Sequence, residues 1–211
     1  MFAVEVLDGV TLSRVSAGLK VVADGLRRGP IVNAGGLFVW LKEDRSAFRK
    51  LSIEPETLPY ERVELTVAQL RLPPLPRPMT TVLLPPAAGY PFPSGMTGVR
   101  GILVEDLADT PRRPVIDAEV RLRWLDDDGI TWHDAATASR TTDHGDFVLV
   151  PTLAPADVPR LDATGAVTVR LLVSRAGGSP RRAQDLNVPQ GRIADPATSS
   201  GLIVAWADLS P

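Results

Sequence analysis

The sequence predicts an all-β protein built from two β-sandwich domains in tandem, and three observations lead to this fold class. Prolines and glycines are frequent, with 20 and 17 among 211 residues, and they are spread along the chain. Because proline fixes φ and removes a backbone donor, this spread favours strands joined by many turns over helices. Short runs rich in β-branched and apolar residues recur between the turn signals, as in sandwiches. Apolar residues make up 44% of the chain, which is enough to form buried cores.

Six strands are predicted in the first half of the chain. The run Leu65–Leu72 alternates apolar and polar residues with one slip in phase, which a β-bulge would explain. Helix is hard to place, because the best candidate, Glu43–Leu51, is too short to bury much apolar surface. We expect loop or strand there. The predicted strands are Phe2–Leu7, Leu19–Ala23, Leu37–Leu41, Leu51–Ile53, Val63–Val67 and Thr80–Leu84.

The second half shows the clearest alternation in the chain, at Ala118–Leu125. Val120, Leu122 and Trp124 are expected to face the core of a second sandwich. The run Asp126–Gly129 that follows predicts a hairpin turn, since glycine adopts positive φ freely. The predicted strands of this half are Gly98–Asp106, Ala118–Leu125, Ile130–Arg140, Phe147–Pro151, Ala166–Ser174 and Gly201–Leu209.

A proline-rich stretch separates the two halves. Consecutive prolines between Pro73 and Pro93 favour extended polyproline II backbone, so this stretch predicts a stiff connector. The alternative is a ligand for a proline-binding domain, because the stretch contains a PxxP pattern. We therefore expect a first domain over residues 1–88, a joint over 89–97 and a second domain over 98–211.

Charge and cysteine content exclude several classes of function. The 23 basic and 25 acidic side chains form no block of one sign, which argues against a nucleic-acid binder. The absence of cysteine excludes disulfides and Cys-based zinc sites. Met1–Gly9 lacks the features of a secretion signal, and no apolar run is long enough to span a bilayer. The sequence predicts no membrane insertion and a cytoplasmic location, or release as part of a particle.

The segment Thr141–Val150 raises the question of an active site. Asp143 and His144 are adjacent in this segment, and His133 and Asp134 are adjacent just upstream. The two His–Asp pairs could form a metal site only if both segments meet in space.

The simpler interpretation of this segment is a turn. Asp143 would cap the turn with its side chain, and Gly145 would supply positive φ. Phe147 would then enter the core, and His144 would be exposed. The sequence also lacks H-E-x-x-H and G-x-S-x-G patterns. We therefore expect no catalytic, cofactor-binding or metal site, and no cofactor.

Three motifs in the second half occur in the order of a known domain family. Gly101–Val104, Pro114–Val120 and Thr142–Phe147 resemble the G-x-V, P-V-x-x-A-x-V and T-D-x-x-G-x-F motifs of the carboxypeptidase regulatory-like domain. That family is a transthyretin-like β-sandwich, and the resemblance covers residues 98–211. It implies an accessory domain without peptidase residues. Pro114 would then start an extended segment, and Ala118 would leave room for close packing of the sheets.

The first half looks like an immunoglobulin-type domain with Gly36–Leu41 as its central strand. Together with the proline-rich joint and the second sandwich, this is similar to accessory proteins of phage-tail-like contractile injection systems. The resemblance implies a non-enzymatic structural or adaptor subunit of a large assembly, such as a cap or other terminal component. Its partners would be other protein subunits, including further copies of itself.

Two other functions are alternatives. A carbohydrate- or surface-binding accessory module would need exposed aromatic side chains, which Trp132 and Trp206 could provide, while Trp40 and Trp124 are expected to be buried. An enzyme is the third alternative, and no set of residues in the sequence supports it.

Overall fold

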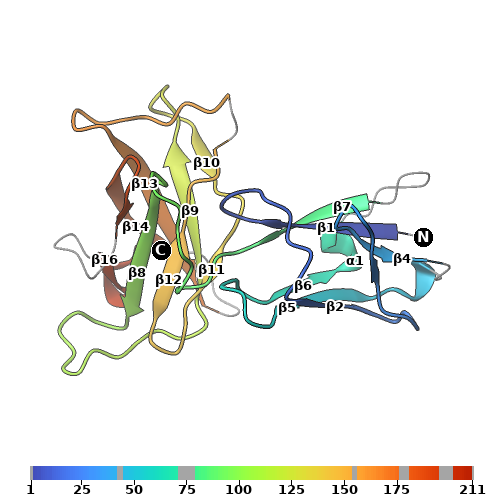
Figure 1. Cartoon of the computed structure of the whole chain (residues 1–211). Coiled ribbons are helices and arrows are strands. Elements are labelled where there is room, and N and C mark those ends of the chain that lie inside the picture. The colour runs from blue at the N-terminus through green and yellow to red at the C-terminus, as the bar shows by residue number, and fades with distance from the viewer. Residues whose placement is uncertain are drawn as a thin grey trace. The chain divides into compact units, whose positions relative to one another are not determined.

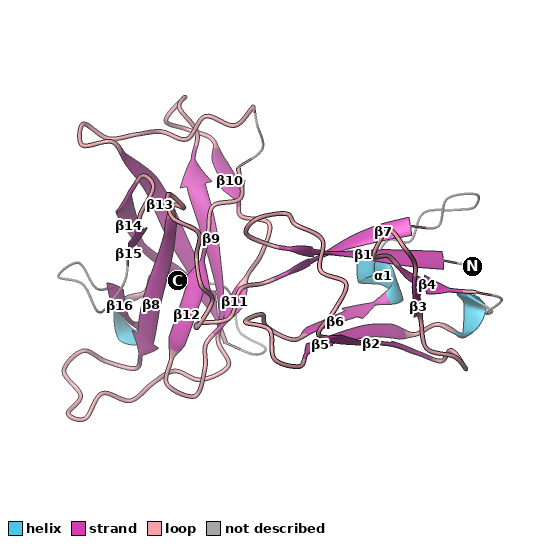
Figure 2. Cartoon of the chain, in the orientation of Figure 1, coloured by secondary structure: helices cyan, strands magenta, loops and turns pink. Residues whose placement is uncertain are grey.

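The computed structural model describes residues 2–41, 45–70, 79–153, 156–175, 181–194 and 202–210. These residues form mostly β-strands, with one short α-helix and two 3-10 turns (Figures 1 and 2). The predicted all-β class is confirmed, and the strands form several sheets in a sandwich-like arrangement.

The chain divides into two compact units, Met1–Pro86 and Ala87–Pro211. The predicted joint, residues 89–97, therefore falls within the second unit. Tyr90 is buried there, and its carbonyl oxygen accepts a hydrogen bond from Arg100 Nη2 at 3.1 Å. The guanidinium of Arg100 also lies 5.6 Å from the centre of the Phe92 ring. Independent folding of the two halves stays a prediction.

Unit 1 contains two sheets with a shared core. In the first sheet, β3 (Ile31–Val32), β4 (Phe38–Trp40), β1 (Phe2–Asp8) and β7 (Met79–Leu84) lie in that order. β1 is antiparallel to β4 and parallel to β7. The second sheet has the order β2 (Leu19–Asp24), β5 (Lys50–Pro55), β6 (Val63–Thr66), and all its pairs are antiparallel.

Aromatic rings form the centre of the unit 1 core. Phe2 and Trp40 stack with ring centroids 4.7 Å apart, and Phe48 lies 5.2 Å from Phe2. Burial of such large side chains is the main force that holds two sheets together. The buried cluster consists of Phe2, Val4, Val6, Val21, Ala23, Phe38, Trp40, Phe48, Leu51, Ile53, Leu70, Val82 and Leu84.

A buried carboxylate also links the two sheets of unit 1. Asp8, at the end of β1, accepts N–H bonds from Val10 (2.7 Å) and Thr11 (3.2 Å). Its other oxygen accepts a hydrogen bond from the hydroxyl group of Tyr60 at 3.0 Å. Tyr60 lies in the connection between β5 and β6. The pKa of Tyr60 is raised to about 12, mainly by burial of its hydroxyl group and next by the negative charge of Asp8. The contact thus joins the first sheet to the second.

One predicted strand of unit 1 needs correction. The predicted strand continuing through Leu65–Leu72 ends at Thr66, and α1 (Val67–Leu70) follows it. Gln69 Oε1 accepts from the backbone N–H of Thr66 at 2.9 Å, and Thr66 Oγ1 accepts from the N–H of Gln69 at 3.4 Å. This is the reciprocal pattern of a capping box, which starts a helical turn. Residues 71 and 72 lie outside the described residues.

The expectation of loop or strand over Glu43–Leu51 is confirmed at residues 48–51. Arg45–Ala47 forms a 3-10 turn, and β5 begins at Lys50, while residues 43 and 44 lie outside the described part of the chain. The two-residue edge strand β3 was not predicted. A strand this short carries no periodic pattern that could identify it.

Unit 2 also contains two sheets. In one sheet the order is β10 (Trp132–Asp134), β9 (Glu119–Leu125), β13 (Ala166–Ser174), β14 (Arg181–Pro189), and β11 (Ser139–Arg140) also pairs with β9. In the other, β8 (Gly98–Val104) lies between β12 (Asp146–Leu149) on one side and β15 (Ile193–Ala194) and β16 (Leu202–Ala205) on the other. β15 and β16 both run parallel to β8.

The predicted alternation in β9 is confirmed, since Val120, Leu122 and Trp124 are fully buried. The core of unit 2 consists of Val99, Leu103, Val115, Ala118, Val120, Leu122, Trp124, Phe147, Leu149, Val167, Val169, Leu171, Val173, Val188 and Leu209.

Three features of unit 2 differ from the prediction. The run Ile130–Arg140 forms two short strands, β10 and β11, and not one. The run Gly201–Leu209 leaves the strand conformation at Ala205 and continues as a 3-10 turn over Trp206–Asp208. β14 was not predicted because its sequence contains many polar residues and no clear alternation, and β15 was not predicted because two residues carry no periodic pattern.

Candidate functional site

The segment that suggested an active site forms a tight turn between β11 and β12. Gly145 has φ of +80°, and a Cβ atom there would lie 2.4 Å from the carbonyl oxygen of Leu103. The side chain that caps the turn is Thr142, and not Asp143 as predicted. Thr142 Oγ1 accepts N–H bonds from His144 (3.2 Å) and Asp146 (3.1 Å). The hydroxyl reaches these donors because it lies at the first position of the turn.

The neighbours of this turn lie where the turn interpretation places them. Phe147 is buried in the core, and the His144 side chain is 82% exposed. Asp143 is equally exposed, and its carboxylate lies 3.8 Å from His144 Nε2. Turn chemistry accounts for this segment.

The second histidine has a different set of partners. His133 Nε2 lies 2.8 Å from Asp126 Oδ2, and its ring stacks on Trp124 with centroids 4.4 Å apart. The hydrogen bond with His133 is the main cause of a lowered pKa of Asp126. Asp134, the neighbour of His133, pairs with Arg123 at 3.0 Å. Among the described residues, no three His, Asp or Glu side chains come together in a group that could hold a metal ion.

The four tryptophans divide as the sequence predicts. Trp40 and Trp124 are buried, while Trp132 and Trp206 are partly exposed. A guanidinium lies over each of the partly exposed rings, Arg170 at 3.9 Å from Trp132 and Arg175 at 4.3 Å from Trp206. Such cation–π contacts cover one face of each indole.

Each of these two arginines is held by a carboxylate. Arg170 donates two hydrogen bonds to Asp185, at 2.5 and 2.7 Å, and Arg175 donates one to Glu105 at 2.6 Å. A bidentate pair fixes the plane of the guanidinium. Carboxylates of the same unit therefore hold in place the arginines that cover the two rings.

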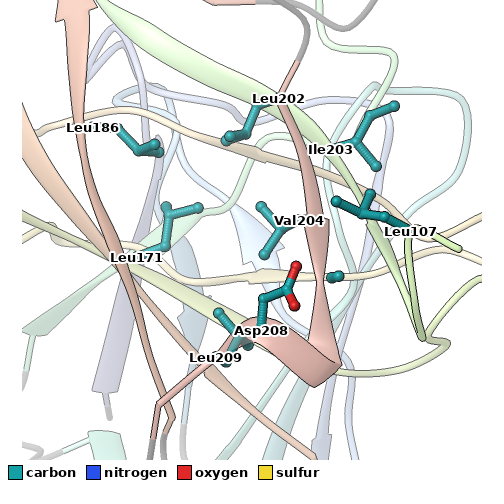
Figure 3. A pocket seen from close by; sticks show the side chains of 9 residues that line it. Leu107, Leu171, Leu186, Leu202, Ile203, Val204, Asp208 and Leu209 are labelled. Carbon is teal, nitrogen blue, oxygen red and sulfur yellow. The ribbon is translucent and has the colours of Figure 1, made fainter.

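Unit 2 has an apolar pocket with a volume of about 220 Å³ (Figure 3). It lies where β13 and β14 of one sheet face β16 of the other, and it reaches the buried side chain of Leu171. Among the described residues that line it, Asp208 carries the one charged group. The lining residues are Leu107, Leu171, Leu186, Leu202, Ile203, Val204, Ala205, Asp208 and Leu209.

Sequence reasoning missed this pocket. The lining residues come from four separate segments of the chain, and each segment by itself reads as ordinary strand or loop. A faint signal exists in the run of Leu202 to Ala205, where all four side chains are apolar, although a half-exposed edge strand usually alternates.

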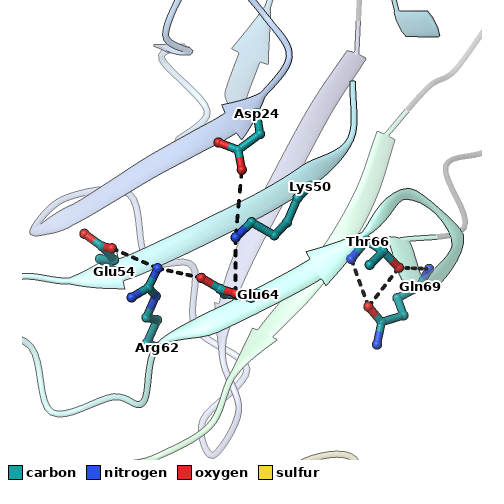
Figure 4. A network of polar contacts seen from close by, with 7 residues as sticks. All are labelled: Asp24, Lys50, Glu54, Arg62, Glu64, Thr66 and Gln69. Atoms are coloured by element: carbon teal, nitrogen blue, oxygen red, sulfur yellow. Dashed lines mark hydrogen bonds and ion pairs between the residues drawn. The ribbon is translucent and has the colours of Figure 1, made fainter. Parts of the chain in front are cut away.

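The two outer faces of unit 1 differ in chemistry. Three acidic and three basic side chains cover the face formed by β2, β5 and β6, and Figure 4 shows all of them except Lys20. Lys50 lies 3.3 Å from Glu64 and 3.8 Å from Asp24, and Arg62 lies 2.5 Å from Glu64 and 3.3 Å from Glu54. The hydrogen bond from Lys50 is the main cause of a lowered pKa of Glu64. These charged side chains make the face hydrophilic, as is typical of a solvent-exposed surface.

The outer face of the other sheet carries an apolar row across all four strands. Cα pairing places Ile31 beside Val39, Val39 beside Ala3, and Ala3 beside Met79. The strand neighbours of Ala3 and Val39, such as Val4, point into the core, so the row points outward. Ile31 is 55% exposed and Met79 46%.

The rest of this face is also poor in charge. The next row contains Glu5, which pairs with Arg14 and accepts a hydrogen bond from Thr81 at 3.2 Å. The row beyond it pairs Leu7 with Leu83, both partly exposed. The acid on this face is thus neutralised within the unit.

No protein-family model matches the sequence, and neither a curated protein nor a solved structure matches it. Within the described ranges, no helix has the length and apolar character that a membrane crossing needs.

Proposed function

We propose that the protein is a non-enzymatic structural or adaptor subunit of a larger protein assembly, and that it docks on a partner through the outer face of the β3-β4-β1-β7 sheet. The observation that carries this proposal is the apolar row Ile31–Val39–Ala3–Met79. Contiguous exposed apolar surface on a soluble protein marks an interaction site more often than isolated apolar side chains do.

The strand sequences support the same conclusion. β1 reads FAVEVLD, so that it has apolar residues on both faces apart from Glu5 and the terminal Asp8. β2, in contrast, reads LKVVAD and sends Lys20 and Asp24 outward. A strand with apolar residues on both faces is typical of sheets that are covered on both sides. A partner would supply the missing cover of the first sheet.

Flat sheet faces also suit protein partners better than small ligands. Four strands at about 4.8 Å spacing give a surface about 19 Å wide, with no pocket required. Burial of an exposed Ile or Met contributes about 1.5–3 kcal/mol per side chain, against the entropic cost of association. Since Glu5 is already paired with Arg14, docking would bury this carboxylate as one member of an ion pair.

The sequence resemblance suggests the kind of assembly. We propose a cap or other terminal component of a phage-tail-like contractile injection particle, with a carboxypeptidase regulatory-like second domain. The positive φ of Gly145 and the burial of Ala118 and Phe147 support this, because the family motifs require these properties. Other subunits of the particle, including further copies of this chain, would be the partners.

The alternative of carbohydrate binding has less support. Sugars stack on open aromatic faces, and in Trp132 and Trp206 one face of each ring is covered by an arginine.

Sedimentation of particles tests the proposal. The chain is expressed in cells together with its neighbouring genes, and we expect it to sediment with high-molecular-mass particles. The double variant Ile31→Lys/Met79→Lys is expected to stay in the supernatant. Val22→Lys is the matched control, because Val22 is also an exposed aliphatic residue (40%) but lies on the charged outer face. Equal sedimentation of all three proteins, or a parent chain found entirely as free monomer, would contradict the proposal.

A further inference from the structure

We propose that the apolar pocket of unit 2 binds one aliphatic side chain of an extended protein segment that carries a basic residue next to it. The pocket lies in a different unit from the docking face described above. The inference rests on the proposed function only in taking the ligand to be a protein segment.

The size of the pocket fits a side chain. A cavity of about 150 Å³ lined by aliphatic residues is known to bind benzene, and pockets for drug-sized ligands begin at about 300 Å³. The volume of about 220 Å³ lies between these values. The pocket therefore suits a Leu, Ile or Met side chain, and it is small for a cofactor.

The lining excludes a polar occupant. Leu171 and Leu209 at its floor belong to the buried core, and Leu186, Leu202 and Val204 pack against that core as partly buried residues. Their aliphatic carbons offer no hydrogen bonds, so a polar group placed there would lose its hydration without compensation.

A negative charge that lines the pocket determines which residue of the bound segment fits next to the aliphatic side chain. Asp208 lines the pocket and is exposed, and Figure 3 shows its carboxylate next to Val204 and Leu209. The Asp208 carboxylate forms no ion pair with a described basic side chain.

The exposed carboxylate of Asp208 beside an apolar pocket attracts a cation and repels an anion. A fatty acid, which is apolar but anionic, is therefore a poor fit, whereas a peptide with Lys or Arg beside Leu or Ile is a good one.

The backbone geometry agrees with an extended segment. Among the described strands β16 pairs with β8 alone, and an edge strand can accept an added strand.

Three short peptides test the proposal on the full-length protein. Acetyl-Gly-Lys-Leu-Lys-Gly-amide carries the proposed chemistry, a second peptide replaces both Lys with Glu, and a third replaces Leu with Ser. Methyl NMR of the aliphatic side chains reports binding. We expect the first peptide to shift the methyl signals of Leu186, Val204 and Leu209 with a dissociation constant in the millimolar range or below. The Ser peptide is expected to bind about tenfold or more weakly, and the Glu peptide about two- to fivefold more weakly.

Matched variants assign the effect to the pocket. Asp208→Asn keeps the shape and removes the charge, so we expect it to reduce the preference for Lys over Glu while binding of Leu persists. Asp143→Asn is the control, because Asp143 is an exposed aspartate in the turn before β12. Val204→Phe fills the pocket and is expected to abolish the shifts. Leu186→Phe serves the same purpose if Val204→Phe does not fold.

Equal binding of the Lys and Glu peptides would overturn the proposal, as would shifts confined to residues outside the pocket or no shift with any peptide. Each of these outcomes leaves the docking face of unit 1 untouched, since particle sedimentation with Ile31→Lys/Met79→Lys measures that face separately. Failure of one proposal is therefore distinguishable from failure of the other.

Discussion

The two outer faces of unit 1 enclose the same core and have opposite chemistry. On the β2-β5-β6 face, every strand sends charged side chains outward, and acids and bases are paired across the strands. On the β3-β4-β1-β7 face, an apolar row crosses the whole sheet, and the Glu5 carboxylate is paired within the unit. The core alone requires only one apolar face per sheet. The second apolar face therefore needs another explanation, and the proposed docking would supply one.

The largest expected effect comes from the core that both faces share. Trp40→Ala removes a fully buried indole that stacks on Phe2. We expect a loss of about 3–5 kcal/mol in the free energy of unfolding of unit 1, because a large cavity forms. Chemical denaturation followed by circular dichroism measures this loss. A loss below about 1 kcal/mol would mean that the two sheets do not depend on a common core.

Tyr60→Phe tests the link between the two sheets. It removes the hydroxyl that donates to buried Asp8, and we expect a loss of about 1 kcal/mol near neutral pH. The pKa of Tyr60 is raised from its ordinary value of 10.0 to about 12, so the stabilisation is fully present below pH 10 and is lost as pH rises toward 12. Denaturation of parent and variant across this range measures it. If the difference in the free energy of unfolding between parent and variant stays constant up to pH 12, the hydroxyl does not bond to Asp8.

Glu64→Gln tests the charged face. The substitution removes one carboxylate from the pairs with Lys50 and Arg62. Because exposed ion pairs are screened by salt, we expect a small decrease in melting temperature at low ionic strength that disappears in high salt. The lowered pKa of Glu64 means that this stabilisation is present above its ordinary pKa of 4.5 and is lost as pH falls below it. A difference that persists in high salt would indicate a packing role.

The smallest expected change in stability belongs to the apolar face. Ile31→Lys/Met79→Lys alters exposed side chains, so we expect a change within about 0.5 kcal/mol per residue. Binding of a hydrophobic dye to the native protein is expected to fall, while Val22→Lys leaves it nearly unchanged. If both variants reduce dye binding equally, the two faces are not as different as the side chains indicate.

Local chemistry made much of the fold predictable. Alternation in β9 identified which side chains are buried, and the turn at Gly145 followed from a glycine that must adopt positive φ. The capping box of Thr66 and Gln69 was also present in the sequence. It was overlooked because the apolar residues around it fit a strand pattern, although the hydrogen bonds of the cap decide in favour of a helical turn.

The sequence by itself determined the all-β class, most strands and the turn that resembled an active site, because propensity, alternation and positive φ act over a few residues. Only the tertiary structure decided which strands become neighbours. Ala3 and Met79 lie 76 residues apart, yet β1 and β7 pair in a register that places them side by side. The pocket of unit 2 likewise exists only because β14 and β16 lie at the same open side of the sandwich. Such surfaces depend on long-range pairing, which is set by the energy of the whole core and has no signature in a short stretch of sequence.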